Sequence, residues 1–201
     1  MTLPRLVTVI ALSAVVLLVS GCVTSPPTPE LSQFTAPAKP ICRVAVLPFV
    51  NHTEYVRGDL IVYRIFVAEL SRLGGFSVVQ EGDIRKIFRQ MKLSPKETPG
   101  YEQTLVLADR LAVDAVITGE IITMREERGK QETAPELAVE VKLVPAGSSK
   151  PWLTTYHRRR GDDYRQVMHF GLVNTMTALT ARLSDEILQL WFSKGLTPCA
   201  S

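Results

Sequence analysis

The feature that most limits how this chain can fold is an uncharged, largely apolar run that ends at a cysteine. Residues 6–19 carry no charge, and they follow Arg5 and the amino terminus. About 20 apolar residues are needed to span a bilayer, whereas a shorter apolar core behind a positive amino end is typical of a secretory signal. Residues 1–21 are therefore predicted to be a signal peptide that takes no part in the fold.

The cysteine at the end of this run lies in a recognisable setting. Val19-Ser20-Gly21-Cys22 resembles the bacterial lipobox, which implies cleavage before Cys22 and a diacylglycerol on its sulfur. Each buried methylene contributes about 0.8 kcal/mol, so several acyl chains, palmitate among them, form a stable anchor. Val23 stands where an aspartate would favour the inner membrane, so we expect a lipid anchor in the outer membrane with the protein facing the periplasm. The alternative is an uncleaved transmembrane helix with an incidental cysteine.

Beyond the anchor, residues 22–41 are predicted to be a linker and residues 42–201 a single periplasmic domain. The linker prediction rests on five prolines, which favour extended polyproline geometry. Two cysteines remain, Cys42 and Cys199, and the compartment is oxidising. A disulfide between them would close a loop of about 157 residues and contribute up to about 5 kcal/mol in the chain-entropy model. The alternative is two unpaired thiols.

Composition and motifs exclude several classes of function. The formal net charge is +3 with Arg5 included, and no block of five like charges occurs, so a nucleic-acid partner is not expected. The sequence has no phosphate loop, no dinucleotide fingerprint and no G-x-S-x-G motif. None of the three histidines has metal-ligand spacing with another ligand. We therefore expect no catalytic residues, no metal and no cofactor, and keep a periplasmic enzyme as the alternative from another class.

Apolar periodicity predicts alternating strands and helices in the mature chain. The predicted strands are 43–49, 76–79, 115–122, 136–144 and 152–157, and the predicted helices are 59–73, 82–91, 102–111 and 164–194. Residues 124–135 are polar and are predicted to be a connection, and Gly119 indicates a bulge or a close approach within its strand. This order predicts an α/β layered sandwich with a mixed β-sheet, a β-hairpin and a long C-terminal helix.

Three segments of this pattern also resemble a known superfamily. They read VAVLPFVNHTE, GGFSVVQEGDIRKIFRQMKLSP and ADRLAVDAVITGEI, and they cover roughly residues 43–120. They are similar to the superfamily of the curli-secretion lipoproteins, the penicillin-binding-protein activator lipoproteins and the amino-terminal domain of TolB. The resemblance concerns the fold and contains no catalytic signature. It implies a periplasmic α/β domain that binds protein partners and, in some members, assembles into a ring.

Three places are candidates for partner binding. His52 follows the first predicted strand, where α/β folds place sites, although Asn51 and Thr53 beside it also suit an ordinary turn. Arg158, Arg159 and Arg160 form the only basic cluster, which is either a solvated hairpin edge or a contact surface for an anionic polymer or an acidic partner. Leu188 and Phe192 break the pattern of the last helix and form either a second core layer or an exposed apolar patch.

These observations predict a non-catalytic envelope lipoprotein that acts through protein contacts. It would be a component of an assembly, secretion or polysaccharide-export machine, anchored to the membrane by lipid and bound to another envelope protein. A homo-oligomeric ring is one form of that assembly. The alternative within the same class is an activator of a cell-wall (peptidoglycan) synthase, and the sequence does not name the partner.

Overall fold

A mixed sheet of seven strands organises the chain. The structure is a computed structural model that describes residues 28–37, 39–128, 133–148, 150–166 and 170–199. The strands are β1 (Glu30–Phe34), β2 (Arg43–Val46), β3 (Val50–Asn51), β4 (Ser77–Val78), β5 (Ala115–Arg128), β6 (Thr133–Pro145) and β7 (Leu153–Arg160). The helices are α2 (Gly58–Leu73), α3 (Glu81–Gln90), α4 (Tyr101–Leu111), the 3₁₀-helix η1 (Gly161–Tyr164) and α5 (Met176–Ser193). The predicted α/β sandwich with a mixed sheet, a hairpin and a C-terminal helix is confirmed.

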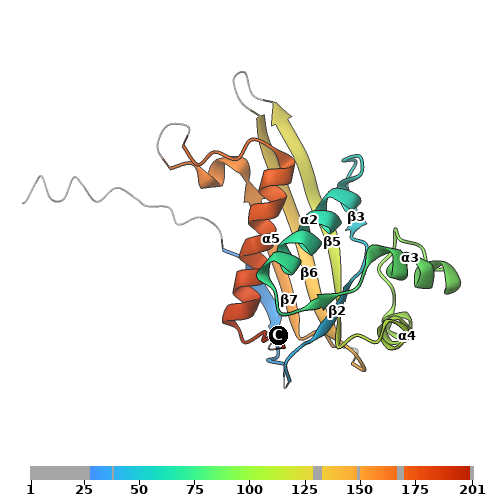
Figure 1. Cartoon of the computed structure of the whole chain (residues 1–201). Helices are drawn as coiled ribbons and strands as arrows, with labels where there is room; N and C mark the ends of the chain where they lie inside the picture. Colours follow the sequence, from blue (N-terminus) through green and yellow to red (C-terminus); the bar gives the residue numbers. More distant parts are fainter. Residues whose placement is uncertain (1–27, 38, 129–132, 149, 167–169, 200–201) are drawn as a thin grey trace, which may run out of the picture.

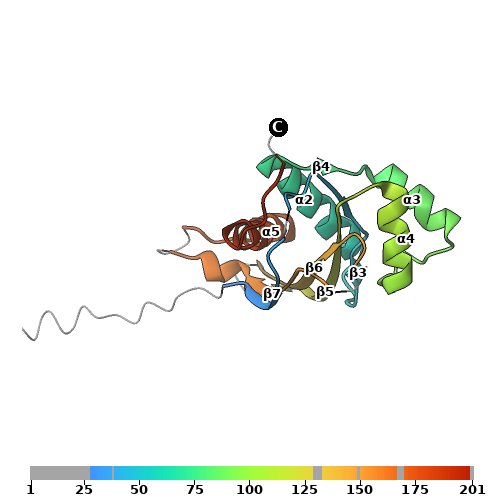
Figure 2. The same ribbon diagram turned by 90° about the horizontal axis from the view of Figure 1, so that it is seen from below.

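The sheet has a parallel part and an antiparallel part. Its strand order is β1-β7-β6-β5-β2-β4, and β3 also pairs with β5. β2 is parallel to both β4 and β5. Along the chain, α2 lies between β2 and β4, and α3 and α4 lie between β4 and β5. β5, β6 and β7 form an antiparallel meander, and β1 adds to the outer side of β7. The two ends of the strand order, β1 and β4, therefore lie far apart (Figures 1 and 2).

The helices divide into two pairs that build two cores. α2 and α5 cover one face of the sheet (Figure 1) and bury the larger core, in which Phe66 lies 5.6 Å from Phe49 and 6.3 Å from Trp191 between ring centroids. α3 and α4 bury a smaller core against the parallel part (Figure 2). Successive residues of a strand point to opposite faces, so Val44 and Val46 enter the larger core while Ala45 and Leu47 enter the smaller one.

Gly119 marks a close approach between the sheet and an aromatic ring. A Cβ atom at this position would lie 2.2 Å from the Phe49 ring. The register irregularity of β5 lies further along, between Ile121 and Thr123. Of the two explanations offered by the sequence, close approach is therefore the correct one for this glycine.

Cys42 and Cys199 form a disulfide in the structure, with 4.8 Å between their Cα atoms. Backbone bonds hold the same two segments together, because the Ile41 amide donates to the Thr197 carbonyl at 2.9 Å and the Cys199 amide donates to the Ile41 carbonyl at 3.1 Å. Ile41 itself is buried. The C-terminal segment is therefore fixed beside the start of β2.

The linker predicted over residues 22–41 is wrong in its second half. Glu30–Phe34 forms β1, which pairs with β7 and ends with the Thr35 amide donating to the Trp152 carbonyl at 2.7 Å. The five residues alternate between exposed and half-buried positions. Their order comes from backbone hydrogen bonds to a strand more than 100 residues away, so the local pattern of the segment does not indicate it.

The polar connection predicted over residues 124–135 is also wrong. β5 continues to Arg128 and β6 begins at Thr133, so both strands extend into the predicted connection and pair with each other there. Met124 and Leu137 remain buried on the helix-covered face of this extension, while Arg125 donates on the opposite face to Glu136, which is itself buried. The charges that suggested a loop pair across the hairpin and are compatible with a strand.

The last helix is shorter than predicted. α5 begins at Met176, twelve residues after the predicted start, and Thr175 caps it by accepting a hydrogen bond from the Ala178 amide at 3.3 Å. The residues at the predicted start of the helix instead form η1, where the Asp163 carboxylate accepts from the Arg160 amide at 2.8 Å. The chain therefore turns before the helix. His169 lies outside the described residues.

Candidate interaction site at the end of the parallel strands

A cavity of about 540 Å³ opens where the parallel strands end and two helices begin. Pro48 follows the end of β2, Asp59 and Leu60 lie in the first turn of α2, and Glu81 begins α3. In open α/β sheets, ligands bind beyond the carboxyl ends of the strands, at the point where the strand order reverses. β2 is that point here, since its two parallel neighbours, β4 and β5, lie on opposite sides of it. The cavity thus occupies the position expected of a binding site.

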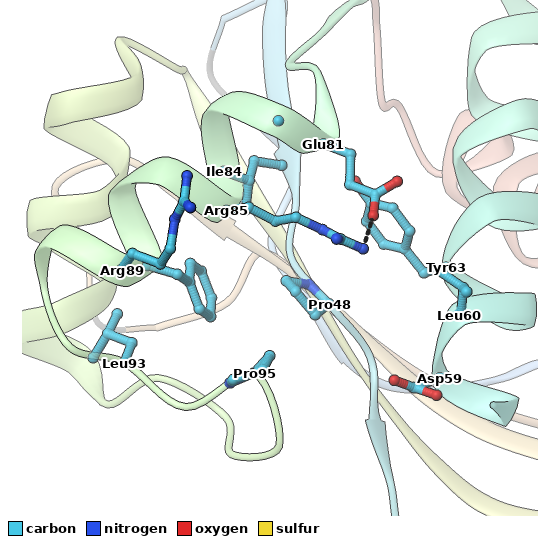
Figure 3. A pocket seen from close by; sticks show the side chains of 12 residues that line it. Pro48, Asp59, Leu60, Tyr63, Glu81, Ile84, Arg85, Arg89, Leu93 and Pro95 are labelled. Atoms are coloured by element: carbon cyan, nitrogen blue, oxygen red, sulfur yellow. Dashed lines mark ion pairs between the residues drawn. The ribbon is translucent and has the colours of Figure 1, made fainter. Parts of the chain in front are cut away.

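The walls of the cavity are mainly apolar. They include Tyr63 from α2, Phe88 from α3, and Leu93 and Pro95 from the loop that follows α3. Figure 3 shows Pro48 between the side of Tyr63 and the side of Leu93 and Pro95. Burial, with a smaller contribution from the Glu81 carboxylate, raises the pKa of Tyr63 to about 12. Its hydroxyl therefore stays neutral at physiological pH.

The charges at the rim of the cavity largely cancel. Arg85 forms an ion pair with Glu81 (Figure 3), and Arg64 lies 3.8 Å from the same carboxylate. Asp59 and Arg89 add one charge of each sign. The two carboxylates also lie at the starts of α2 and α3, where they complement the positive ends of the helix dipoles. The cavity is therefore better suited to an uncharged, partly apolar ligand than to an anion.

His52 follows a strand end, but the strand is β3, a separate short strand that was not predicted, because the first predicted strand ends in the structure at Val46. Its Nε2 lies 3.1 Å from Glu120 Oε2, and the Thr98 hydroxyl donates to Glu120 Oε1 at 2.9 Å. Burial works to raise the pKa of Glu120, but the hydrogen bonds from Thr98 and His52 outweigh it and lower that pKa. Thr98 belongs to the loop that carries Leu93 and Pro95, so this contact fixes one wall of the cavity against β5.

The arrangement around Glu120 is not a hydroxyl–imidazole pair of the kind that activates a nucleophile. The carboxylate stands between the Thr98 hydroxyl and the His52 imidazole. The imidazole is therefore not placed to remove the hydroxyl proton. His52 is accordingly read as a residue that positions Glu120. Among the residues that the structure describes, no group of three His, Cys, Asp or Glu side chains is placed to hold a metal ion.

Arg158, Arg159 and Arg160 do not form one surface: Arg159 is buried, so it cannot belong to a basic contact surface, whereas a contact role for Arg158 and Arg160 stays a prediction. Alternation along β7 directs Arg159 toward α5 and its two neighbours toward the open face of the sheet. Arg158 Nε donates to Glu136 at 2.6 Å, and Arg160 Nε donates to Asp162 at 3.2 Å. Burial opposes ionisation of Glu136, but bonds from Arg125 and Arg158 lower its pKa. The arginines are thus matched by carboxylates.

Arg159 belongs to a charge cluster beneath α5 in which Arg159 and His157 are buried and Glu186 is half-buried. Its Nε and Nη2 donate to Glu186 at 2.8 Å each, His157 Nε2 lies 2.5 Å from Glu186 Oε2, and the Tyr164 hydroxyl donates to Glu186 Oε1 at 3.0 Å. Burial works to raise the pKa of Glu186, but the bonds from His157 and Arg159 lower it to about 2. Burial and the charge of Glu186 raise the pKa of Tyr164. Glu186 is therefore ionised, and the cluster joins α5 to β7.

The exposed apolar patch predicted at Leu188 and Phe192 is wrong. Leu188 is completely buried in the larger core, and Phe192 is half-buried with its ring 5.8 Å from the ring of Phe76. α5 packs against both the sheet and the neighbouring helix α2, so it buries a wider stripe than a helix that contacts one layer. The second core layer, which the sequence left open, is the correct interpretation.

Sequence reasoning did not find the cavity residues or Glu186. Tyr63 and Phe88 lie within predicted helices, and nothing in the sequence indicated that either is near an opening. Glu120 and Glu186 each gain their partners from segments far away in the chain. One signal was available, since Pro48 ends a buried strand and therefore marks the end of the sheet where ligands bind. Cys22 lies outside the described residues.

Comparisons with known proteins show the fold. No known protein family matches the sequence, and no curated protein matches it. Among solved structures, a PelC dodecamer from Paraburkholderia phytofirmans in space group P6 is 15% identical, with 86% of this chain and 99% of that chain covered and a TM-score of 0.56. A PelC dodecamer from the same organism in space group C2 is 16% identical, with 82% of this chain and 98% of that chain covered and a TM-score of 0.57.

A further match is lipoprotein GNA1162 from Neisseria meningitidis, 16% identical over 76% of this chain and 99% of that chain, with a TM-score of 0.53. At these identities the likeness concerns fold alone, and at that level it confirms the similarity to lipoprotein domains noted in the sequence. None of the helices in the described part of the chain is long and apolar enough to cross a membrane.

Proposed function

We propose that this protein is a lipid-anchored, non-catalytic component of an envelope assembly, secretion or polysaccharide-export machine, and that it works as a ring of identical copies. The observation that carries the proposal is the match of its fold to nearly the whole PelC chain, which forms a dodecamer in two crystal forms. The second match, to a lipoprotein, supports an envelope location. The proposed place is the outer membrane, with the domain facing the periplasm.

The proposed anchor is the lipidated sulfur of Cys22. Because β1 begins at Glu30, only eight positions separate the anchor from the folded sheet. At roughly 3.1 Å per residue, this tether reaches about 25 Å, less than half the length that a linker up to residue 41 would give. The proposed domain therefore stays close to its membrane, which favours contacts between neighbouring copies by restricting them to one layer.

The topology of the sheet supports a ring. In the described part of the chain the sheet is open, with β1 at one end of the strand order and β4 at the other. The two ends are different surfaces, so a contact that joins one to the other is heterologous. Repeated heterologous contacts generate a closed ring when a whole number of the rotations that relate neighbouring copies completes a full turn.

Light scattering of residues 23–201, without lipid and over a range of concentrations, tests the ring. A single large oligomer of fixed mass supports it. A monomer at every concentration rejects it and favours the second candidate, an activator of a cell-wall synthase that docks on a larger partner. Labelling of the full chain with palmitate tests the anchor, because the label should enter the protein and be lost in the Cys22→Ala variant. Label that persists in this variant would reject Cys22 as the lipid site.

A further inference from the structure

We propose that the cavity at the end of the parallel strands binds the proline-rich segment 23–29 of a neighbouring copy. This inference rests on the proposed ring and names one of the contacts that would hold it together. The segment reads Val-Thr-Ser-Pro-Pro-Thr-Pro and leads directly into β1.

The cavity has the composition of a groove that recognises proline-rich chains. Such grooves present aromatic and other apolar side chains to a polyproline II helix. Here Tyr63 and Phe88 supply the aromatic groups, and Pro48, Leu93 and Pro95 supply the other apolar surfaces. The volume of about 540 Å³ lies within the range of roughly 300–1,000 Å³ usual for ligand sites.

The loop that carries Pro95 and Leu93 is held in place before any ligand arrives. The Thr98 hydroxyl in this loop donates to the Glu120 carboxylate at 2.9 Å. At the end of the loop, where α4 begins, the Gly100 amide donates to the Gln103 side chain at 2.9 Å. A site whose walls are already ordered loses less conformational entropy on binding.

The segment has the complementary chemistry. It contains three prolines, no glycine and no charged residue. Proline-rich chains populate the polyproline II conformation before they bind, so little ordering is needed. Glu81 at the rim is already paired with Arg85, and the other two charged lining residues, Asp59 and Arg89, are opposite in sign. The charges that line the cavity therefore sum to zero, which favours an uncharged segment over a charged ligand.

The positions of the two partners favour a neighbouring copy over the same copy. The segment precedes β1 in the sequence, and the cavity is lined by residues beside β2 and α3. β1 and β2 lie on different sides of the sheet (Figures 1 and 2). Four strand spacings separate β1 from β2, about 19 Å at roughly 4.8 Å per spacing. The seven residues of the segment reach about 22 Å in a polyproline II helix, so binding within one copy would leave almost no residues to fill the cavity. Binding to the next copy has no such limit and joins the two different ends of the sheet.

A peptide-binding experiment tests the recognition. The probe is the capped peptide Val-Thr-Ser-Pro-Pro-Thr-Pro, titrated by calorimetry into residues 28–201, which retain every strand of the described fold. We expect saturable binding that weakens at least tenfold in Pro95→Asp and in Leu93→Asp. The matched control is Val106→Asp, an equally drastic change at an exposed position on α4 outside the cavity, which should bind as the parent chain does. A peptide with alanine at its three prolines should not bind.

Light scattering separates this inference from the proposed ring. We expect residues 23–201 to form the oligomer at a concentration at least tenfold lower than residues 28–201. If both fragments assemble equally and the peptide does not bind, the inference fails while the ring stands. If binding is equal in the parent chain and in both cavity variants, the cavity is the wrong site. If neither fragment assembles, the ring fails, and the neighbouring copy fails with it as the donor of the segment.

Discussion

Replacement of Glu186 by glutamine tests whether the charge cluster beneath α5 holds that helix against the sheet. Glutamine keeps the size of the side chain and removes its charge. Arg159, which is 5% exposed, would lose its counter-charge, and its Nη1 already has no hydrogen-bond partner in the described part of the chain. His157, which is 1% exposed, would lose the carboxylate 2.5 Å from its Nε2.

The expected loss of stability follows from this geometry. Removal of one partner from a buried ion pair costs about 3–5 kcal/mol, because it leaves an uncompensated charge in the interior. A domain of this size loses about 2–4 °C in melting temperature for each kcal/mol. We therefore expect E186Q to lower the melting temperature by about 6–20 °C at pH 7. Since folded domains are stable by only about 5–15 kcal/mol, the change should be unmistakable.

The same cluster predicts a dependence on pH. The pKa of Glu186 is lowered to about 2 in the folded protein, whereas an unperturbed glutamate titrates near 4.3. The stabilisation is therefore complete above about pH 4.3 and is lost as the pH falls toward 2. The difference of about two pKa units corresponds to roughly 3 kcal/mol, in agreement with the cost of the substitution. The gap in stability between the parent and E186Q should narrow steadily between pH 5 and pH 2.

Urea unfolding of both proteins across this pH range measures the effect. The matched control is Asp185→Asn, which lies beside Glu186 on α5 and pairs at the surface with Arg72, a side chain that is 58% exposed. Exposed pairs contribute only about 0–1 kcal/mol, so this variant should unfold almost as the parent does. A loss below 1 kcal/mol for E186Q, or an equal loss in the two variants, would refute the reasoning.

Three further changes test other parts of the fold. Gly119→Ala would place a methyl group 2.2 Å from the Phe49 ring. We expect overpacking to lower the free energy of unfolding by about 1–3 kcal/mol, and unchanged urea unfolding would contradict the close approach. The double variant Cys42→Ser, Cys199→Ser opens a loop with a sequence separation of 157. Its melting temperature, measured by calorimetry, should fall by an amount that corresponds to at most about 5 kcal/mol. An unchanged melting temperature would show that the disulfide contributes nothing to stability. Trp191→Phe removes the 2.7 Å hydrogen bond from the indole to the Thr155 hydroxyl, and urea unfolding should show a loss of at least 1 kcal/mol; equal stability would contradict the bond.

Periodicity predicted the parts of the fold whose stability comes from burial on one face. Leu137, Val139, Val141 and Leu143 alternate along β6, and all four are buried in the larger core. The apolar residues of α3 follow helical spacing in the same way, with Ile84 and Phe88 buried. Such patterns are visible in the sequence because each residue contributes by its own hydrophobicity.

The elements that were missed depend on partners far away in the chain. β1 is held by β7, and the charged end of the β5–β6 hairpin is held by pairs such as Arg125 with Glu136. Taken alone, these segments look like a linker and a loop, because their hydrogen-bond and charge partners are not local.

The candidate site was predictable only in part, for the same reason. His52 was identified from its place after a strand, and it does lie at the end of β3. The cavity is built from the end of β2, two helix starts and one loop, and no single segment carries its pattern. The arginines appeared as one cluster in sequence, but the two-residue repeat of a strand places them on opposite faces of the sheet, and their carboxylate partners come from other elements.

The native mass of the full-length protein, extracted from membranes in detergent and measured by mass spectrometry, tests the central claim most directly. We expect one dominant complex whose mass is a fixed multiple of the mature chain, which begins at Cys22 and carries one lipidated cysteine per copy. A lipidated monomer would contradict the ring, and a complex of unmodified full-length chains would contradict the anchor.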